Sequence, residues 1–172
     1  IIDPTLTVSV PPFVTAATGV DAMAHCVEAY TSKRSHPLID AYALQGIELV
    51  GKYLRRAVED GSDLEARAGL SLAAFYGGVC LGPVNTTSGH AVAYPLGTRH
   101  KLPHGIANAL IFPHTLAANA LAAPEKTSAI CAALGHPEWL QDERFSDIRQ
   151  AMRNRGDLQQ MISDAFAQID YA

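Results

Sequence analysis

Four side chains of this 172-residue sequence are of types that could share one metal ion, namely Asp21, His25, His90 and His104. Asp21 and His25 stand four residues apart in TGVDAMAHCVEAY, a stretch that reads as a helix. Residues at this spacing lie on one face of a helix, with Cβ atoms about 5–6 Å apart. The carboxylate and the imidazole can therefore point at the same cation, or they can simply hydrogen-bond to each other.

His90 and His104 could complete such a site from another part of the chain. Gly89 precedes His90, while Pro103 and Gly105 flank His104. Small and stiff neighbours let the backbone come close to a ligand and fix the direction of the imidazole. A carboxylate with neutral imidazoles suits a borderline divalent cation, which acts as a Lewis acid when one coordination position stays open. The spacing favours a site with four ligands without establishing it.

The composition predicts a soluble globular domain in the cytoplasm. Hydrophobic residues make up 48% of the chain and charged residues 17%, and the net charge is −4. This charge offers no basic surface for nucleic acid, and no apolar run reaches the roughly 18 residues that span a bilayer. We also find no signal peptide. The three cysteines are far apart, which favours reduced thiols, and Cys26 is expected to pack in the core.

Helical periodicity dominates the chain after the first residues and predicts an all-α, multi-helix bundle of about seven or eight helices. By contrast, residues 1–14 read as the tail of a strand running into a proline-stiffened connector. The first methionine is Met23. We therefore expect residues 1–14 to connect to an N-terminal domain that is missing from this chain, and residues 15–172 to form a helical metal-binding domain.

Local signals predict where the helices begin and end. The first is expected over residues 20–32 with Thr15 or Thr18 as its cap, and the second begins at Pro37. Ser62 and Glu65 form a capping-box pattern for the third. The remaining expectations are a short helix over residues 85–95 stopped by Pro95, a helix kinked near Pro113, one from Pro124 to Gly135, and two amphipathic helices separated near Gly156.

Two long stretches carry a family resemblance. TAATGVDAMAHCVEAYTS at residues 15–32 and GHAVAYPLGTRHKLPHGIANALIFPH at residues 89–114 resemble the signatures of the iron-containing (group III) alcohol dehydrogenases. The resemblance covers roughly residues 1–135 and is weak after Gly135. It implies a C-terminal domain of the dehydroquinate synthase-like kind, with the family's N-terminal Rossmann-like domain missing from this chain. The family's aspartate and three histidine ligands correspond to Asp21, His25, His90 and His104.

The resemblance also implies the chemistry of an intact parent protein. The metal would be Fe²⁺ or Zn²⁺, the hydride carrier NAD or NADP, the substrate a small alcohol or an aldehyde or ketone, and the assembly a homodimer. Many members have a histidine where this chain has Tyr94, and His100 could substitute for it. We expect both to line the pocket. Gly77 and Gly78 neither follow a strand nor open a helix, so they are no dinucleotide fingerprint.

Two other functions remain open at this stage. The same ligands could activate water in a metal-dependent lyase or hydrolase, and dependence on nicotinamide would separate that enzyme from a dehydrogenase. The second alternative is a non-catalytic helical dimerisation module. In either case we expect the 172-residue fragment alone to show no alcohol-dependent reduction of NAD(P).

Overall fold

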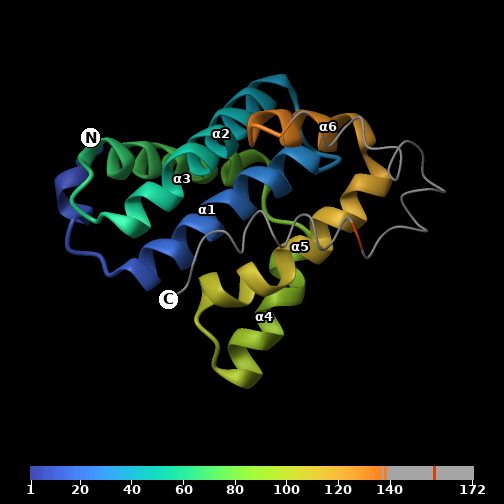
Figure 1. The fold of residues 1–172 in the computed structure, drawn as a ribbon. Helices are drawn as coiled ribbons and strands as arrows, with labels where there is room; N and C mark the ends of the chain where they lie inside the picture. The colour runs from blue at the N-terminus through green and yellow to red at the C-terminus, as the bar shows by residue number, and fades with distance from the viewer. Residues whose placement is uncertain (137, 139–156, 158–172) are drawn as a thin grey trace.

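The computed structural model describes residues 1–136, 138 and 157, and in this part of the chain every regular element is a helix (Figure 1). The predicted all-α class is confirmed. The helices, in chain order, are the 3-10 helix η1 (Pro4–Thr7), α1 (Pro12–Thr31), α2 (Pro37–Glu59), α3 (Leu64–Val84), α4 (Ser88–His100), α5 (His104–Ala122) and α6 (Pro124–Ala133). The helices predicted on either side of Gly156 lie outside the described residues.

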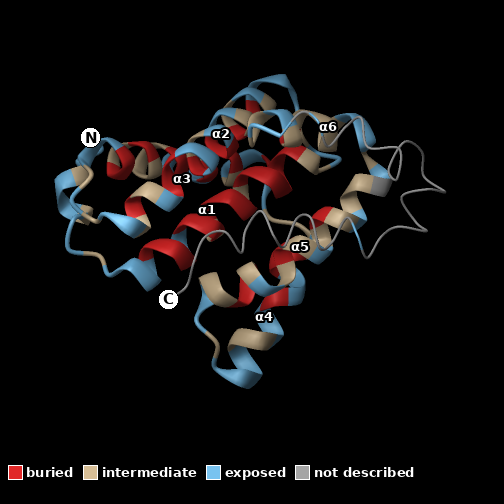
Figure 2. Ribbon diagram, in the orientation of Figure 1, coloured by how far each residue is buried: buried red, intermediate tan, exposed pale blue. Residues whose placement is uncertain are grey.

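Helix α1 runs through the middle of the fold, with α2 and α3 along one side of it and α4 and α5 along the other (Figure 1). Thirteen of its 20 residues are buried, against three of the 13 residues of α4, so α1 is the element around which the rest packs (Figure 2). Met23 and Val27 of α1 meet Ile47 and Leu54 of α2 in the main apolar cluster. Burial of each such side chain contributes about 1.5–3 kcal/mol.

The start of α1 differs from the prediction. The helix begins at Pro12, not near residue 20, because proline at the first helical position has no N–H to leave unpaired. Thr18 does not cap a helix: its hydroxyl donates to the carbonyl of Val14, 2.8 Å away, inside the helix. The strand-like reading of the first residues is also wrong in part, since Pro4–Thr7 form a 3-10 helix whose N-terminus is capped by Asp3.

A buried arginine ties the segment before α1 to the helical body. Arg67 of α3 is 3% exposed, and its guanidinium donates to the hydroxyl of Thr15 at 2.7 Å and to the carbonyl oxygen of Val10 at 3.0 Å. It also donates to the carbonyl oxygen of Gly61, before α3, at 3.0 Å. The planar fork thus satisfies three acceptors at once and fixes the direction in which the chain enters α1.

One proline and one cap differ from the prediction. Pro95 lies inside α4, which continues to His100, so the prediction that it stops the helix is wrong. Pro113 lies inside α5, which continues to Ala122. A proline removes one backbone hydrogen bond without ending the helix if flanking turns hold. The cap of α3 is Asp63, which accepts from the backbone N–H of Ala66, so the predicted Ser62 cap is off by one residue. Gly135, with φ of 85°, follows the end of α6 as expected.

The three cysteines are free, and two of them are fully buried. Burial raises the pKa of the Cys26 thiol to about 12 and that of the Cys80 thiol to about 11. Cys26 lies against Gly46 of α2, where a Cβ would come within 2.5 Å of its sulfur. The predicted packing role of Cys26 is therefore confirmed, and Gly46 marks a close helix contact.

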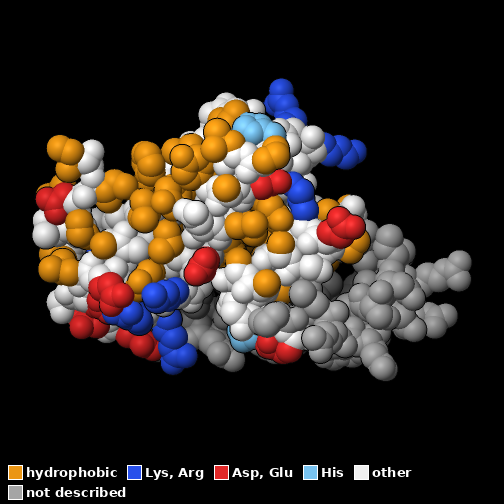
Figure 3. Space-filling model, turned by 90° about the horizontal axis from the view of Figure 1, so that it is seen from above, with side chains coloured by type: hydrophobic (Ala, Val, Ile, Leu, Met, Phe, Trp, Pro, Cys, Tyr) orange, Lys and Arg blue, Asp and Glu red, His pale blue; other side chains and the backbone are white. Residues whose placement is uncertain are grey.

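The upper face of the molecule exposes many hydrophobic side chains on the side where α2 and α3 lie (Figure 3). Leu38, Leu64 and Phe75 are among the exposed large hydrophobics of these two helices. In the described residues no single helix has the length and apolar composition of a membrane span. Helices α3 and α4 pass that test only when counted together, and they are bent by 105° relative to each other.

Candidate metal centre

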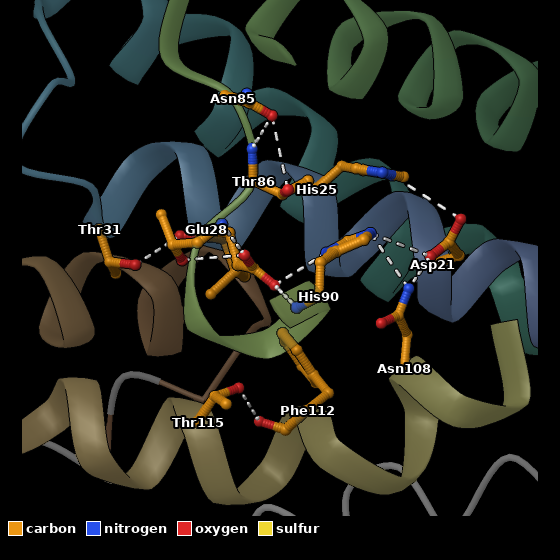
Figure 4. A network of polar contacts seen from close by, with 12 residues as sticks. Asp21, His25, Glu28, Thr31, Asn85, Thr86, His90, Asn108, Phe112 and Thr115 are labelled. Carbon is orange, nitrogen blue, oxygen red and sulfur yellow. Dashed lines mark hydrogen bonds and ion pairs between the residues drawn. The ribbon is translucent and has the colours of Figure 1, made fainter. Parts of the chain in front are cut away.

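Three of the four predicted ligands meet where α1, α4 and α5 converge. Asp21 Oδ1 lies 3.5 Å from His90 Nε2 and 3.5 Å from His104 Nε2. These three ligand atoms are all within 4.8 Å of one another. Figure 4 shows Asp21 on α1 with the imidazole of His90 directed toward it. One carboxylate oxygen and two imidazole nitrogens, drawn from three helices, therefore face one common space.

His25, the fourth predicted ligand, lies beside this group without joining it. Its Nδ1 is 3.8 Å from Asp21 Oδ2, the carboxylate oxygen that the other two histidines do not face. Its ring lies 4.4 Å from the ring of His90, measured between centroids. The i to i+4 spacing does put Asp21 and His25 on one face of α1, as expected. The structure thus brings three predicted ligands together and places the fourth against them.

Glu28 holds His90 from the opposite side and was not singled out in the sequence. Its Oε1 accepts from His90 Nδ1 at 2.9 Å and from the backbone N–H of His90 at 3.0 Å. Its Oε2 accepts from the hydroxyl of Thr87 at 2.9 Å and from the backbone N–H of Thr87. Since Nδ1 donates to the carboxylate of Glu28, Nε2 is the ring nitrogen that faces Asp21, and it can bind a cation once it has lost its proton.

The electrostatics follow from this sandwich of carboxylates around one imidazole. Burial lowers the pKa of His90, but Asp21 and Glu28 outweigh it and raise the pKa to about 9. Burial raises the pKa of Asp21, yet its contact with His90 and the charge of His25 leave that pKa below its usual value. For His25 burial is the largest effect and lowers the pKa. The site therefore favours an ionised carboxylate, the form that binds cations.

Glycines allow the three helices to approach this closely. A Cβ on Gly89 would lie 2.2 Å from Glu28 Oε1, and one on Gly105 would lie 2.5 Å from the carbonyl oxygen of Ala17. Both glycines neighbour a predicted ligand in the sequence. The close contacts that these glycines allow are with α1, and the expected approach of the backbone to a ligand stays a prediction.

Asn108 is a further site residue that the sequence reading missed. It lies one turn after His104 on α5 and is 2% exposed. Its side-chain nitrogen lies 2.5 Å from Asp21 Oδ1 and 3.1 Å from the Nε2 atoms of His90 and His104. A spacing signal existed for both missed residues. Glu28 follows His25 by three positions and Asn108 follows His104 by four, so each shares a helix face with a predicted ligand.

The two pocket residues proposed from the sequence lie in different places. Tyr94 is 56% exposed and its ring stacks on His104, with centroids 6.0 Å apart and planes 30° apart. His100 is the exposed last residue of α4, and among the described residues no hydrogen bond, ion pair or ring contact joins it to the cluster. Tyr94 thus lies against a candidate ligand and His100 lies apart from it, and the pocket role of both residues stays a prediction.

The donor set fits a borderline divalent cation. Carboxylate oxygen and imidazole nitrogen are ligands that both Fe²⁺ and Zn²⁺ accept, and the hydrogen bond from His90 Nδ1 to Glu28 directs Nε2 inward. The His90 side chain is 2% exposed and the His104 side chain 48%, so the group is closed on one side and open on the other. Gly77 and Gly78 lie inside α3 and form no phosphate-binding loop.

Comparison with known proteins provides independent support for the resemblance. Residues 15–168 match the family model described as Fe-containing alcohol dehydrogenase family, C-terminal, so the likeness extends beyond Gly135. The chain is 43% identical to a 1,3-propanediol dehydrogenase of Klebsiella pneumoniae over 133 residues, which are 77% of this chain and 34% of that protein. It is 36% identical over 164 residues to long-chain-alcohol dehydrogenase 1 of Geobacillus thermodenitrificans, covering 95% and 40%.

Solved structures show the same fold. The crystal structure of a 1,3-propanediol oxidoreductase superposes with a TM-score of 0.82 at 36% identity, covering 95% of this chain and 42% of that one. An alcohol dehydrogenase from Oenococcus oeni gives a TM-score of 0.79 at 31% identity, again covering 95% and 42%. The chain spans about a third to two fifths of the length of the curated relatives that it matches.

Proposed function

The chain belongs to the Fe-containing alcohol dehydrogenase family, and on that premise we propose that it is the metal-binding helical part of an NAD(P)-dependent alcohol dehydrogenase. The observation that carries this proposal is the convergence of Asp21 Oδ1, His90 Nε2 and His104 Nε2 within 4.8 Å of one another. His25, which lies against the same group, is proposed as the fourth ligand. The relatives named above are oxidoreductases that act on alcohols, which favours a dehydrogenase over a hydrolase or lyase.

The chemistry that a bound Fe²⁺ or Zn²⁺ supplies is Lewis-acid polarisation of an alcohol or carbonyl oxygen. The residues of this chain prepare that chemistry. Asp21 contributes a negative charge, and Glu28 holds the ring of His90 through Nδ1 with Nε2 directed inward. The burial of His90 excludes water from one side of the group. The exposed side of His104, where Tyr94 stacks, is where a small substrate would enter.

The remaining parts of the proposal rest on the resemblance and the relatives. These parts are the identity of the metal, the use of NAD or NADP, a small alcohol, aldehyde or ketone as substrate, and a homodimer. A domain that binds the nicotinamide and precedes residue 1, with residues 1–14 as its connector, belongs to the same proposal. Tyr94 is proposed as a pocket residue in place of the family's histidine. The 172-residue chain alone is expected to show no turnover.

The replacement His104→Ala tests the metal site. We expect the purified variant to lose bound metal, measured by elemental analysis after anaerobic purification, while its helical circular dichroism signal stays that of the parent. His114→Ala is the matched control, since His114 is an exposed histidine of the same helix α5. Equal metal content in His104→Ala and the parent protein would contradict the assignment.

A further inference from the structure

The side-chain amide of Asn108 lies in the space that a cation would need. The nitrogen Nδ2 is within 3.1 Å of Asp21 Oδ1, His90 Nε2 and His104 Nε2. These are the same three atoms that form the candidate ligand group. An amide nitrogen has only two hydrogens to donate, so it cannot donate to all three atoms at once. The nitrogen still contacts all three ligand atoms together, not one of them alone.

A cation and this amide group cannot share the space. Ligand distances for a divalent metal to nitrogen and oxygen are about 2.0–2.2 Å. The three ligand atoms are separated by 3.5 Å from Asp21 Oδ1 to each imidazole nitrogen, so a cation bound to all three has to lie between them. The N–H bonds of Asn108 point their partial positive charge into that same region. The two therefore compete for the same lone pairs.

The other end of the amide supports this interpretation. Asn108 Oδ1 is buried, and it has no hydrogen-bond partner within the part of the chain that the structure describes. A buried acceptor without a partner costs free energy, so the side chain is not in this position for the sake of its oxygen. Turning the amide over would place Oδ1 at the position that is now 2.5 Å from a carboxylate oxygen, which is worse. The donors alone hold the amide in place.

We propose that Asn108 is an internal competitor for the cation. Its N–H₂ group donates to Asp21 Oδ1, lies against Nε2 of His90 and of His104, and has to turn away when a cation binds. In this way the protein keeps a carboxylate and two inward-facing imidazoles together without metal, at the cost of weaker metal binding. The inference rests on the proposed metal site, and it assigns to Asn108 a role in tuning affinity rather than in ligation.

The test is a Co²⁺ titration of the parent protein and of Asn108→Ala, with Co²⁺ affinity measured from its visible absorption in competition with a chelator. We expect Asn108→Ala to bind Co²⁺ about tenfold tighter, because no donor has to be displaced. Its melting temperature in the presence of chelator should fall, because the ligand atoms lose their shared donor. Asn119→Ala is the control: Asn119 is on the same helix and donates to Thr31 Oγ1 at 3.0 Å, so only stability should change.

The outcomes separate this inference from the proposed function. A parent protein that binds no Co²⁺ would overturn both. A parent that binds Co²⁺ while Asn108→Ala binds it equally or more weakly would overturn only the role of Asn108. If the alanine variant does not fold, Asn108→Leu decides the matter, since it has nearly the same shape, removes both donors and adds no charge. That variant should bind Co²⁺ more tightly than the parent, and equal or weaker binding would contradict the inference.

Discussion

Helix α2 buries Ile47, Val50 and Leu54 against its neighbours, whereas α4 buries only Gly89, His90 and Ala93. The first region is held by apolar contact, in which each side chain contributes and none is decisive. The second is held by hydrogen bonds, because Glu28 accepts from both the ring and the backbone N–H of His90. The difference indicates that the geometry of the candidate metal centre depends on a few hydrogen bonds far more than on the bulk of the core.

Removing the Glu28 carboxylate should have the largest effect of the changes that test this difference between the two regions. Glu28→Ala leaves the N–H donors of Thr87 and His90 buried without their acceptor, which costs about 1–3 kcal/mol of unfolding free energy. We expect the metal affinity of folded protein to fall by about 10–100-fold, because His90 loses the partner that orients it. Denaturant unfolding and Co²⁺ titration measure the two effects.

Two further variants sharpen the same test. Glu28→Gln keeps one oxygen as acceptor for His90 and should restore part of the metal affinity. Glu48→Ala, at an exposed position of α2, is the control and should change neither quantity by more than experimental error. If Glu28→Ala bound Co²⁺ as tightly as the parent, the hydrogen bonds to Glu28 could not be what positions His90.

The second prediction addresses how closely α5 approaches α1. In Gly105→Ala the new Cβ would lie 2.5 Å from the carbonyl oxygen of Ala17 and 2.8 Å from its carbonyl carbon. Backbone cannot move aside cheaply, so we expect a loss of about 1–3 kcal/mol in unfolding free energy and a weaker metal site. Gly78→Ala in α3 is the matched control.

At Gly78 a Cβ meets nothing within 4 Å, and alanine favours a helix over glycine by up to about 1 kcal/mol. Thermal unfolding of the two variants should therefore shift in opposite directions. Two shifts of the same sign and size would mean that the contact between Gly105 and Ala17 does not govern the approach of α5.

The prediction with the smallest expected effect concerns the reactivity of the thiols buried in the apolar region. With a pKa of about 12, only about one Cys26 thiol in ten thousand is a thiolate at pH 8. We expect Cys26 and Cys80 of the folded protein to resist a thiol reagent at pH 8. At pH values below the pKa, their reaction rate should rise about tenfold for each unit by which the pH is increased. Absorbance of the released thiolate measures this, and urea-unfolded protein is the control. Rapid reaction of all three thiols at pH 8 in folded protein would contradict tight packing around α1.

Much of the fold follows from the sequence, because helix periodicity is a local property. The helices that contain His25, Ile47 and His104 were all predicted in type. Their ends were predicted less well: Pro12 begins α1 and Pro95 does not end α4, since whether a proline starts, bends or stops a helix depends on the turns around it. The ligand residues could be proposed from their types and spacing, aided by a family resemblance.

The supporting residues could not be found in the same way. Glu28 and Asn108 are polar side chains in helices, and a sequence gives such residues a solvent-facing place by default. Only the packing of α4 and α5 on α1 brings them inside and shows what they hold. Conversely, His100 is of the right type and near the right place in the chain, but α4 carries it to an exposed end. Burial is a property of the assembled fold.

The imidazole of His90 is strung between two carboxylates of a single helix, with Nε2 3.5 Å from Asp21 Oδ1 and Nδ1 2.9 Å from Glu28 Oε1. These carboxylates are seven residues apart, which is about two turns or 10.5 Å of helix rise. The ring thus bridges two residues of α1 and is held at both of its nitrogens. Any stretch or bend of those two turns would change the length or direction of the bond from Nε2 to a cation. If the proposed cation binds here, the shape of these two turns of α1 would therefore affect how strongly His90 holds it.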